Sequence, residues 1–179
     1  AADVSNTGSA VATNNTAVGY QAGLSVTTAQ NNTFLGSGAG DAIVVAHDNV
    51  AIGYSSLTAV ATQTGTVAIG SGSLPNLSSG VGNTCVGYQT GIGLTSGARN
   101  TVVGYQAMGD VDGEDCPNSA DNVFIGYQAG GGTWNTDESN YNVGIGSYAM
   151  DGAMYGALDN VAIGYEALSA VTTGNNNVM

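Results

Sequence analysis

The densest group of potential metal ligands in the chain is an acidic segment near its middle: Asp110, Asp112, Glu114 and Asp115. Ca²⁺ prefers several carboxylate oxygens on a flexible loop, and Gly113 gives this segment flexibility. The spacing only half resembles a helix–loop–helix calcium site, because the distal bidentate glutamate is missing. These four residues are the candidate metal site, for Ca²⁺, but a solvated acidic loop is the interpretation we favour. We expect no other cofactor.

Residues suited to catalysis are few. The 179 residues include one histidine, His47, and the single basic residue of the Lys and Arg types is Arg99. Because histidine and lysine supply most general bases and many nucleophiles, we expect no enzyme. The two cysteines, Cys85 and Cys116, can form a disulfide only if their Cα atoms lie within about 7 Å. Two thiols, with Cys85 in a small packed position, are the arrangement we prefer.

Aromatic residues form the other candidate binding surfaces. Tyrosine recurs directly after a glycine, at Tyr20, Tyr54, Tyr88, Tyr105, Tyr127 and Tyr165. This row suits a sugar-binding stripe or a structural ladder, and we favour the ladder because serine interrupts it. Trp134, in a glycine-rich loop, is the candidate receptor contact, since loops carry function on repeat scaffolds; a packed tryptophan is the alternative. Glu166 is the sole carboxylate at its repeat position, and nothing in the sequence marks it as catalytic.

The charge balance excludes several classes of partner. Thirteen acidic residues against one basic residue give a formal net charge of -12. Binding to nucleic acid, or to an anionic membrane surface, requires several lysines or arginines, so we expect neither. No run of 18 apolar residues exists, so we expect no membrane insertion.

The elements that hold these residues are set by an internal repeat. One glycine recurs nine times, at Gly19, Gly36, Gly53, Gly70, Gly87, Gly104, Gly126, Gly146 and Gly164. Successive spacings are 17 residues for the first five intervals and then 22, 20 and 18. A near-constant period of this size indicates a solenoid, here of about nine coils over residues 14–179. Longer loops are expected at residues 109–119 and 131–140.

The two ends depart from the repeat. Residues 1–13 match it poorly, and we expect them to form an N-terminal cap or a docking arm. Residues 177–179 open a tenth copy that stops after three residues. Because solenoids need capping repeats for solubility, we expect this segment to continue into further chain or to abut another subunit.

Each copy follows the pattern N-[TV]-x-[VIL]-G-[YS]-x-[AST]. Aliphatic or β-branched residues at the second and fourth positions alternate with period two, which predicts a short strand. We expect two short strands and two turns per coil, and no helix, given the glycine, valine, threonine and asparagine content. The glycine suits a corner with positive φ, and stacked asparagines suit a hydrogen-bonded ladder. The third position is never charged, so one strand face closes the core of the coil and the other needs a partner.

These repeats resemble a known class. The strings NTAVGYQAG (15–23), NVAIGYSSL (49–57), NTVVGYQAM (100–108) and NVAIGYEAL (160–168) resemble the head repeats of trimeric autotransporter adhesins. They are still more similar to repeats of bacteriophage tail-fibre and other virion fibre proteins. The resemblance covers about residues 14–179. It implies an all-β, left-handed parallel β-roll that packs as a homotrimer, with third-position residues such as Phe34, Val102 and Phe124 facing a neighbouring protomer.

The expected function follows from this resemblance. It implies a structural or adhesive segment, a tail fibre or an adhesin head, that attaches to a host or another surface. The location would be extracellular or on a virion, and the receptor a surface glycan or protein. A self-assembling filament or a capsid-decorating subunit is the main alternative. An ice-binding or polysaccharide-processing solenoid is a third, weakened by irregular threonine spacing and by the lack of basic residues.

Overall fold

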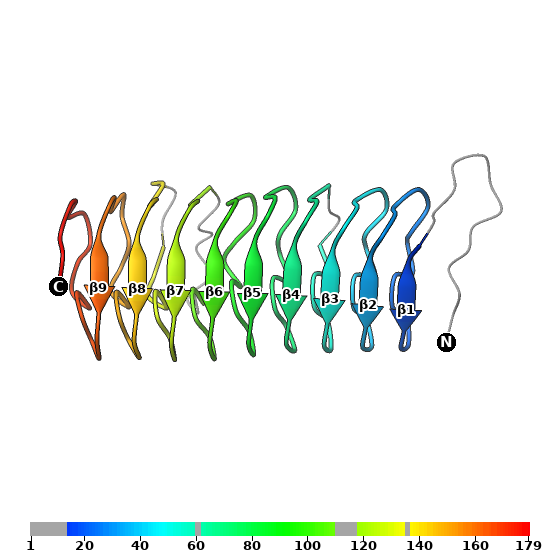
Figure 1. The fold of residues 1–179 in the computed structure, drawn as a ribbon, viewed down its shortest axis with the longest axis horizontal. Helices are drawn as coiled ribbons and strands as arrows, with labels where there is room; N and C mark the ends of the chain where they lie inside the picture. Colours follow the sequence, from blue (N-terminus) through cyan, green and yellow to red (C-terminus); the bar gives the residue numbers. More distant parts are fainter. Residues whose placement is uncertain (1–13, 60–61, 110–117, 135–136) are drawn as a thin grey trace.

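The computed structural model describes residues 14–59, 62–109, 118–134 and 137–179. These residues form a rod in which short strands stack side by side along the long axis (Figure 1). The nine strands of this described part form one sheet in sequence order, and all neighbours are parallel. The strands are β1 (Thr16–Val18), β2 (Thr33–Leu35), β3 (Val50–Ile52), β4 (Val67–Ile69), β5 (Thr84–Val86), β6 (Thr101–Val103), β7 (Val123–Ile125), β8 (Val143–Ile145) and β9 (Val161–Ile163).

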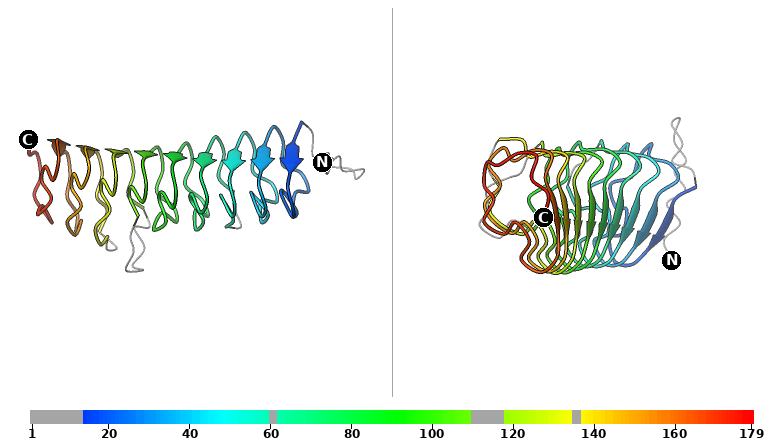
Figure 2. Two further views of the ribbon diagram at one scale, coloured as in Figure 1. Left: turned by 90° about the horizontal axis from the view of Figure 1, so that it is seen from below. Right: turned by 60° about the vertical axis from the view of Figure 1, so that its left-hand side comes forward.

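Each strand belongs to one coil of a β-solenoid, and coil n is the repeat that contains strand βn. Ala17 pairs with Phe34, Ala51 with Ala68, and the same repeat position pairs at every step along the sheet. Figure 2 shows the coils one behind another, each with its strand on the same wall. The regular repeat of the sequence therefore becomes a regular stack, and the predicted parallel all-β solenoid is confirmed. The predicted cap or arm at residues 1–13 lies outside the described residues.

The predicted second strand of each coil is not formed within the described ranges. The residues after the repeat glycine form turns instead, and several have left-handed backbones, such as Gln21 (φ 56°) and Gln106 (φ 51°). A left-handed residue interrupts an extended segment, so a second strand cannot form there. The turns still bond from coil to coil, because the Gly38 N–H donates to the Tyr20 carbonyl oxygen over 2.8 Å.

The repeat glycine is required at the corner that follows each strand. Gly53 has φ 128°, a conformation that residues with a Cβ rarely adopt. A Cβ added to Gly53 would lie 2.6 Å from the carbonyl oxygen of Gly70 in the next coil. The expected positive-φ corner is confirmed, and the coils approach so closely there that any side chain would push them apart.

The core lies inside the coils, and the third strand position lines it. Every third-position residue is buried, including Phe34, Val102 and Phe124, whose exposed fraction is zero. The prediction that these three residues face a neighbouring protomer is therefore wrong. A second or fourth position such as Ile69 is partly exposed, so these positions face outward and the third position faces the core.

Two large core residues fit because glycines leave them room. A Cβ on Gly40 would clash with the Phe34 ring, and a Cβ on Gly130 would lie 2.7 Å from the Phe124 ring. Phe124 also pairs with Gly144 in the next coil. The opposite wall supplies larger apolar side chains to the same core, namely Ile43, Leu57, Leu74, Leu77, Leu94, Met108, Trp134, Met150 and Met154.

Buried asparagines close each coil and join it to the next. The Asn122 side-chain amide donates to the Ser139 carbonyl oxygen at 2.9 Å, which ties the start of coil 7 to its end. The same amide donates to Asn100 Oδ1 at 3.1 Å, and Asn122 Oδ1 accepts from the Asn142 backbone N–H at 2.9 Å. Side-chain amides are linked in this way from Asn83 to Asn177. The predicted asparagine ladder is confirmed.

Coil 4 interrupts this ladder, because Thr66 occupies the asparagine position. Asn49 Oδ1 still accepts from the Thr66 backbone N–H at 2.9 Å. However, the Thr66 hydroxyl and both polar atoms of the nearby Gln63 amide are buried without a hydrogen-bond partner among the described residues. An unpaired buried polar group costs about 1–3 kcal/mol, so this step is a weak point in an otherwise repetitive rod.

Candidate functional site

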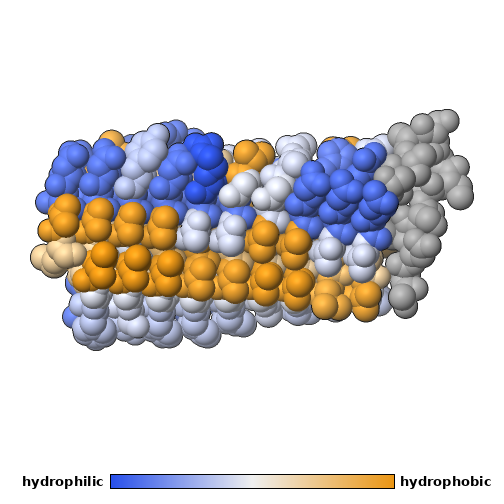
Figure 3. Space-filling view, viewed as in Figure 1, coloured by the Kyte–Doolittle hydropathy of each residue, from blue (hydrophilic) through white to orange (hydrophobic). Residues whose placement is uncertain are grey.

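The second and fourth strand positions form an outer sheet face. It consists of threonine or valine at the second position and valine, leucine or isoleucine at the fourth, in all nine described strands. Val18, Leu35, Ile125 and Ile163 are exposed, and most of the other positions are half-buried. Figure 3 shows the resulting apolar rows running along the rod. Eight inter-strand steps of about 4.8 Å make this face about 38 Å long.

The outer sheet face carries no charge in a chain whose formal net charge is -12. Charged residues therefore lie on other surfaces. A contiguous exposed apolar patch on a soluble protein marks an interaction site. The chemistry of this face is association with another apolar surface, since its side chains offer only methyl groups and threonine hydroxyls.

A tyrosine column runs beside the outer sheet face, two residues beyond the fourth strand position in coils 5, 6, 7 and 9 and three residues beyond it in coil 8. It comprises Tyr88, Tyr105, Tyr127, Tyr148 and Tyr165. The first three rings stack with centroids 5.1 Å and 5.5 Å apart, and Tyr148 and Tyr165 continue the contact edge to face. The predicted structural ladder is confirmed over coils 5 to 9. Stacked rings cover each other's faces, which leaves mainly edges and hydroxyls for solvent.

Tyr20 and Tyr54 stand outside this column. Ser37 and Ser71 occupy the same position in coils 2 and 4, so neither ring has a tyrosine in the adjacent described coils to stack on. Their exposed fractions are 73% and 65%, against 43–46% for Tyr88, Tyr105 and Tyr127. The serine interruptions noted in the sequence thus separate open rings from stacked ones.

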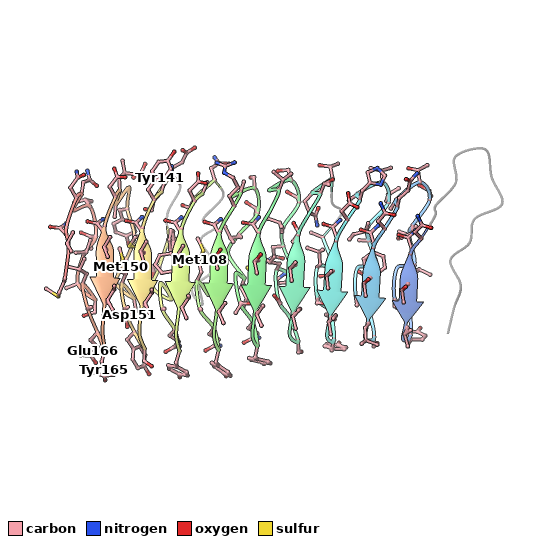
Figure 4. All side chains as sticks on the ribbon, viewed as in Figure 1. Met108, Tyr141, Met150, Asp151, Tyr165 and Glu166 are labelled. Atoms are coloured by element: carbon pink, nitrogen blue, oxygen red, sulfur yellow. The ribbon has the colours of Figure 1, made fainter. Side chains whose placement is uncertain are left out.

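A cleft of about 420 Å³ lies where coils 8 and 9 meet. Its lining residues are Tyr148, Asp151, Tyr165, Glu166 and Ser169, and we call it the coil-8/9 cleft. In Figure 4, Tyr165 and Glu166 lie together at the turn after β9, with Asp151 close by. The cleft therefore combines two phenol rings with two carboxylates and a hydroxyl.

The electrostatics of the cleft are those of an acidic site. Burial raises the pKa of Asp151, and the neighbouring carboxylate of Glu166 raises it further. A hydrogen bond to Glu166 raises the pKa of Tyr165, and a hydrogen bond to Tyr127 raises that of Tyr148. The phenols therefore stay neutral at neutral pH, and the cleft places the two carboxylates close enough to repel each other.

The only arginine of the chain is held in an ion pair. Arg99 Nε and Nη2 donate to the two carboxylate oxygens of Asp121, each over 2.6 Å. This bidentate contact lowers the pKa of Asp121 and raises that of Arg99. Because the sequence has no lysine, Arg99 is the only long basic side chain that could neutralise the cleft, and it is engaged with Asp121.

Trp134 does not lie on a receptor-contact surface. Its side chain is fully buried, and Nε1–H donates to the Gly130 carbonyl oxygen at 2.8 Å. The indole packs edge to face against Phe124, with ring centroids 5.8 Å apart. The receptor-contact prediction for Trp134 is wrong, and the packed alternative is correct. The insertion in coil 7 uses this large side chain to fill the core.

The structure does not test the predicted calcium site or the predicted state of the two cysteines in full. Asp110, Asp112, Glu114, Asp115 and Cys116 lie outside the described residues, so the calcium site and the disulfide stay predictions. Cys85 is buried at a third strand position, as expected. The described part of the chain contains no group of three or more metal-ligating side chains.

His47 has a structural role at a turn. Its Nδ1 accepts a hydrogen bond from the Gln30 backbone N–H in the preceding coil, at 2.9 Å. The neighbouring Asp48 accepts a hydrogen bond from the Asn31 side chain at 3.0 Å. Both side chains therefore join coil 2 to coil 1.

The coil-8/9 cleft was not predicted from the sequence. Its signal was present, since Glu166 is the sole carboxylate at its repeat position and Tyr148 is the sole tyrosine there. Both residues occupy the position after the usual tyrosine, one in each of two successive coils. In-register stacking brings such residues together, and a scan of unusual residues by repeat position could have found the pair.

Comparison of the chain with protein-family models, with curated proteins and with solved structures finds no match. Among the described residues, no helix has the length and apolar character needed to cross a bilayer.

Proposed function

We propose that the chain is a structural and adhesive segment of a fibre, a virion tail fibre or a surface adhesin head. Three copies associate into a homotrimer that holds a host or another surface. The location is extracellular or on a virion. The observation that carries the proposal is the outer sheet face, an uncharged apolar strip along the length of a negatively charged rod. The similarity of the repeats to fibre and adhesin-head repeats supports the same function.

The dimensions of the outer sheet face suit association along the rod. A strip about 38 Å long and about 10 Å wide offers roughly 400 Å². A standard interface buries about 800 Å² of each partner, so a stable interface must also include surfaces that adjoin the outer sheet face. The tyrosine column adjoins it, and aromatic side chains are enriched at protein interfaces. In a three-fold arrangement, the face and column of one rod meet two partners.

The mass of the chain in solution tests the proposal. We expect light scattering to give three times the 17.6 kDa of one chain. Replacing Ile69 on the outer sheet face by Asp should give single chains whose circular dichroism is unchanged, because the residue is partly exposed within one coil. Val45→Asp is the matched control, since Val45 is exposed but lies outside the strands. It should remain a trimer.

Three outcomes would contradict the trimer. They are a wild-type chain that stays single at micromolar concentration, an Ile69→Asp variant that stays trimeric, and filaments whose length grows with concentration. The last would support the alternative of a self-assembling filament. Receptor identity then requires binding assays on the trimer, because multivalent attachment multiplies weak single-site affinities.

The outer sheet face also bears on the ice-binding alternative. Threonine occupies the second position in four of the nine described strands, as Thr16, Thr33, Thr84 and Thr101, and valine occupies the other five. The threonines therefore form two separate pairs on the face instead of one regular array. We expect no thermal hysteresis, and a measured effect would favour ice binding over the fibre.

A further inference from the structure

We propose that the coil-8/9 cleft binds an organic ammonium group, held by the rings of Tyr148 and Tyr165 and the carboxylates of Asp151 and Glu166. This site is formed within one chain, at the end of the tyrosine column beside the outer sheet face, and it requires that the trimer leave Tyr148 and Tyr165 exposed. The ligand chemistry is that of a quaternary or primary alkylammonium.

The geometry of the aromatic rings supports a cation. The rings of Tyr148 and Tyr165 have centroids 6.1 Å apart and planes at 88° to each other, so they form two walls of a corner. Both rings line the cleft. An ammonium group within about 6 Å of a tyrosine ring face is attracted by the ring's electron density. Two perpendicular rings offer one face and one edge, the arrangement of a partial aromatic cage.

The charges of the cleft also favour a cationic ligand. Asp151 and Glu166 both line the cleft, and each adds to the negative potential felt by the other. The chain cannot neutralise them with a long basic side chain, since its one arginine is paired with Asp121. An incoming ammonium group would relieve this like-charge repulsion and gain attraction to both carboxylates. Anionic ligands are excluded by the same charges.

Metal ions fit the cleft less well than an ammonium group. Ca²⁺ takes six to eight oxygen ligands, whereas the cleft offers two carboxylates and three hydroxyls at an open surface. No group of three or more metal-ligating side chains occurs in the ranges that the structure describes. An alkylammonium needs fewer ligands, because its methyl or methylene groups lie against the rings while its charge faces the carboxylates.

Among the described coils, only coils 8 and 9 combine two tyrosines with an aspartate and a glutamate at these repeat positions. The Glu166 position holds glutamine in coils 1, 5, 6 and 7, and glycine or serine in coils 2, 3 and 4. Asp41 occupies the Asp151 position in coil 2, but Gly38 and Ser55 replace the tyrosine and the glutamate beside it. Tyr54 occupies the Tyr165 position, so Asp41 is a natural control, a carboxylate at the same repeat position with one tyrosine but without the second ring and the glutamate.

The test is titration of the full chain with choline, followed by the NMR signals of the tyrosine rings. The control ligand is neohexyl alcohol, in which carbon replaces the quaternary nitrogen of choline, and sodium chloride controls for ionic strength. We expect choline to shift the signals of two tyrosines with a millimolar dissociation constant, and neohexyl alcohol to bind at least about 5-fold more weakly.

Substitutions then assign the site. Glu166→Gln and Asp151→Asn should each weaken choline binding about 2- to 5-fold, as expected for partly exposed charge pairs. Tyr165→Leu should weaken it by a similar factor, whereas Asp41→Asn should leave it unchanged. Equal binding of choline and neohexyl alcohol, identical shifts with sodium chloride, or unchanged affinity in both carboxylate variants would each overturn the proposal. Circular dichroism of each variant checks that the rod remains folded.

Discussion

The first four coils and the last five share one backbone and differ in their side-chain columns. The strand register and the turn hydrogen bonds continue unchanged across the boundary. Tyrosine rings are in contact from Tyr88 to Tyr165, and amide links continue from Asn83 to Asn177. Coils 1 to 4 instead have separated tyrosines and the interruption at Thr66.

This difference teaches which features the fold requires. Hydrogen bonds between coils and corner glycines occur in both halves, so they define the solenoid. Stacked tyrosines and an unbroken amide ladder occur mainly in the second half, so they add stability to a fold that forms without them. In repeat proteins each coil contacts only its neighbours, and such local terms add approximately along the rod. We therefore expect the second half to unfold last.

The largest expected effect on stability concerns the amide ladder of the second half. Asn122→Ala removes bonds to Asn100, Ser139 and Asn142, all among buried groups. We expect a loss of about 3 kcal/mol in the free energy of unfolding, because several buried partners lose their bonds together. Asn49→Ala, beside the interruption, should cost about 1 kcal/mol less. Urea unfolding of both variants measures this, and equal losses would contradict the comparison.

Restoring the asparagine ladder at coil 4 should remove part of the stability difference between the two halves of the rod. The double substitution Gln63→Ala with Thr66→Asn restores the small residue and the asparagine that other coils, such as coil 3, have at these positions. We expect a gain of about 1–2 kcal/mol, because three unpaired polar atoms disappear and a ladder amide is added.

The single substitutions provide the control for this repair. Thr66→Asn alone should gain less, since the Gln63 side chain still occupies the space, and Gln63→Ala alone should leave a cavity. A double-mutant cycle by urea unfolding measures the coupling between the two sites. Additive effects, or a double variant less stable than the wild type, would show that the interruption is not a weak point.

The smallest expected effect on stability concerns the tyrosines. Tyr105→Ala removes stacking on two rings at 5.1 Å and 5.5 Å, whereas Tyr54→Ala removes an open ring. We expect Tyr105→Ala to cost about 1 kcal/mol more, the energy typical of one or two aromatic contacts. Thermal unfolding of the two variants at equal concentration measures this. A larger loss from Tyr54→Ala would reverse the assignment of the stacked column as a stabilising feature.

The sequence predicted the solenoid, its period, the glycine corner and the asparagine ladder, because each depends on the repeat alone. It did not determine which strand face points inward, since both faces are apolar and a period of two is satisfied either way. A neglected signal was size. The third position is mostly small, and its two phenylalanines, Phe34 and Phe124, are accompanied by glycines that make room for them.

The burial of Trp134 and the formation of the coil-8/9 cleft could not be predicted without the three-dimensional structure. Trp134 looked accessible because its loop is rich in glycine, yet the longer loop folds the indole back onto Phe124. The coil-8/9 cleft joins residues from two coils whose sequence separation is set by an 18-residue interval. Its chemistry depends on Tyr148 and Glu166 meeting across that interval, which the repeat pattern alone does not emphasise.

The asparagine ladder gives the rod a direction. From Asn177 back to Asn83, every linked side-chain amide donates its N–H toward the preceding coil and presents its oxygen to the following one. The amide dipoles therefore point the same way and polarise one another. Two such rods joined head to tail would continue the alternation of donors and acceptors. Joined head to head or tail to tail, they would place like groups against each other, so this molecule favours polar over symmetric end-to-end assemblies.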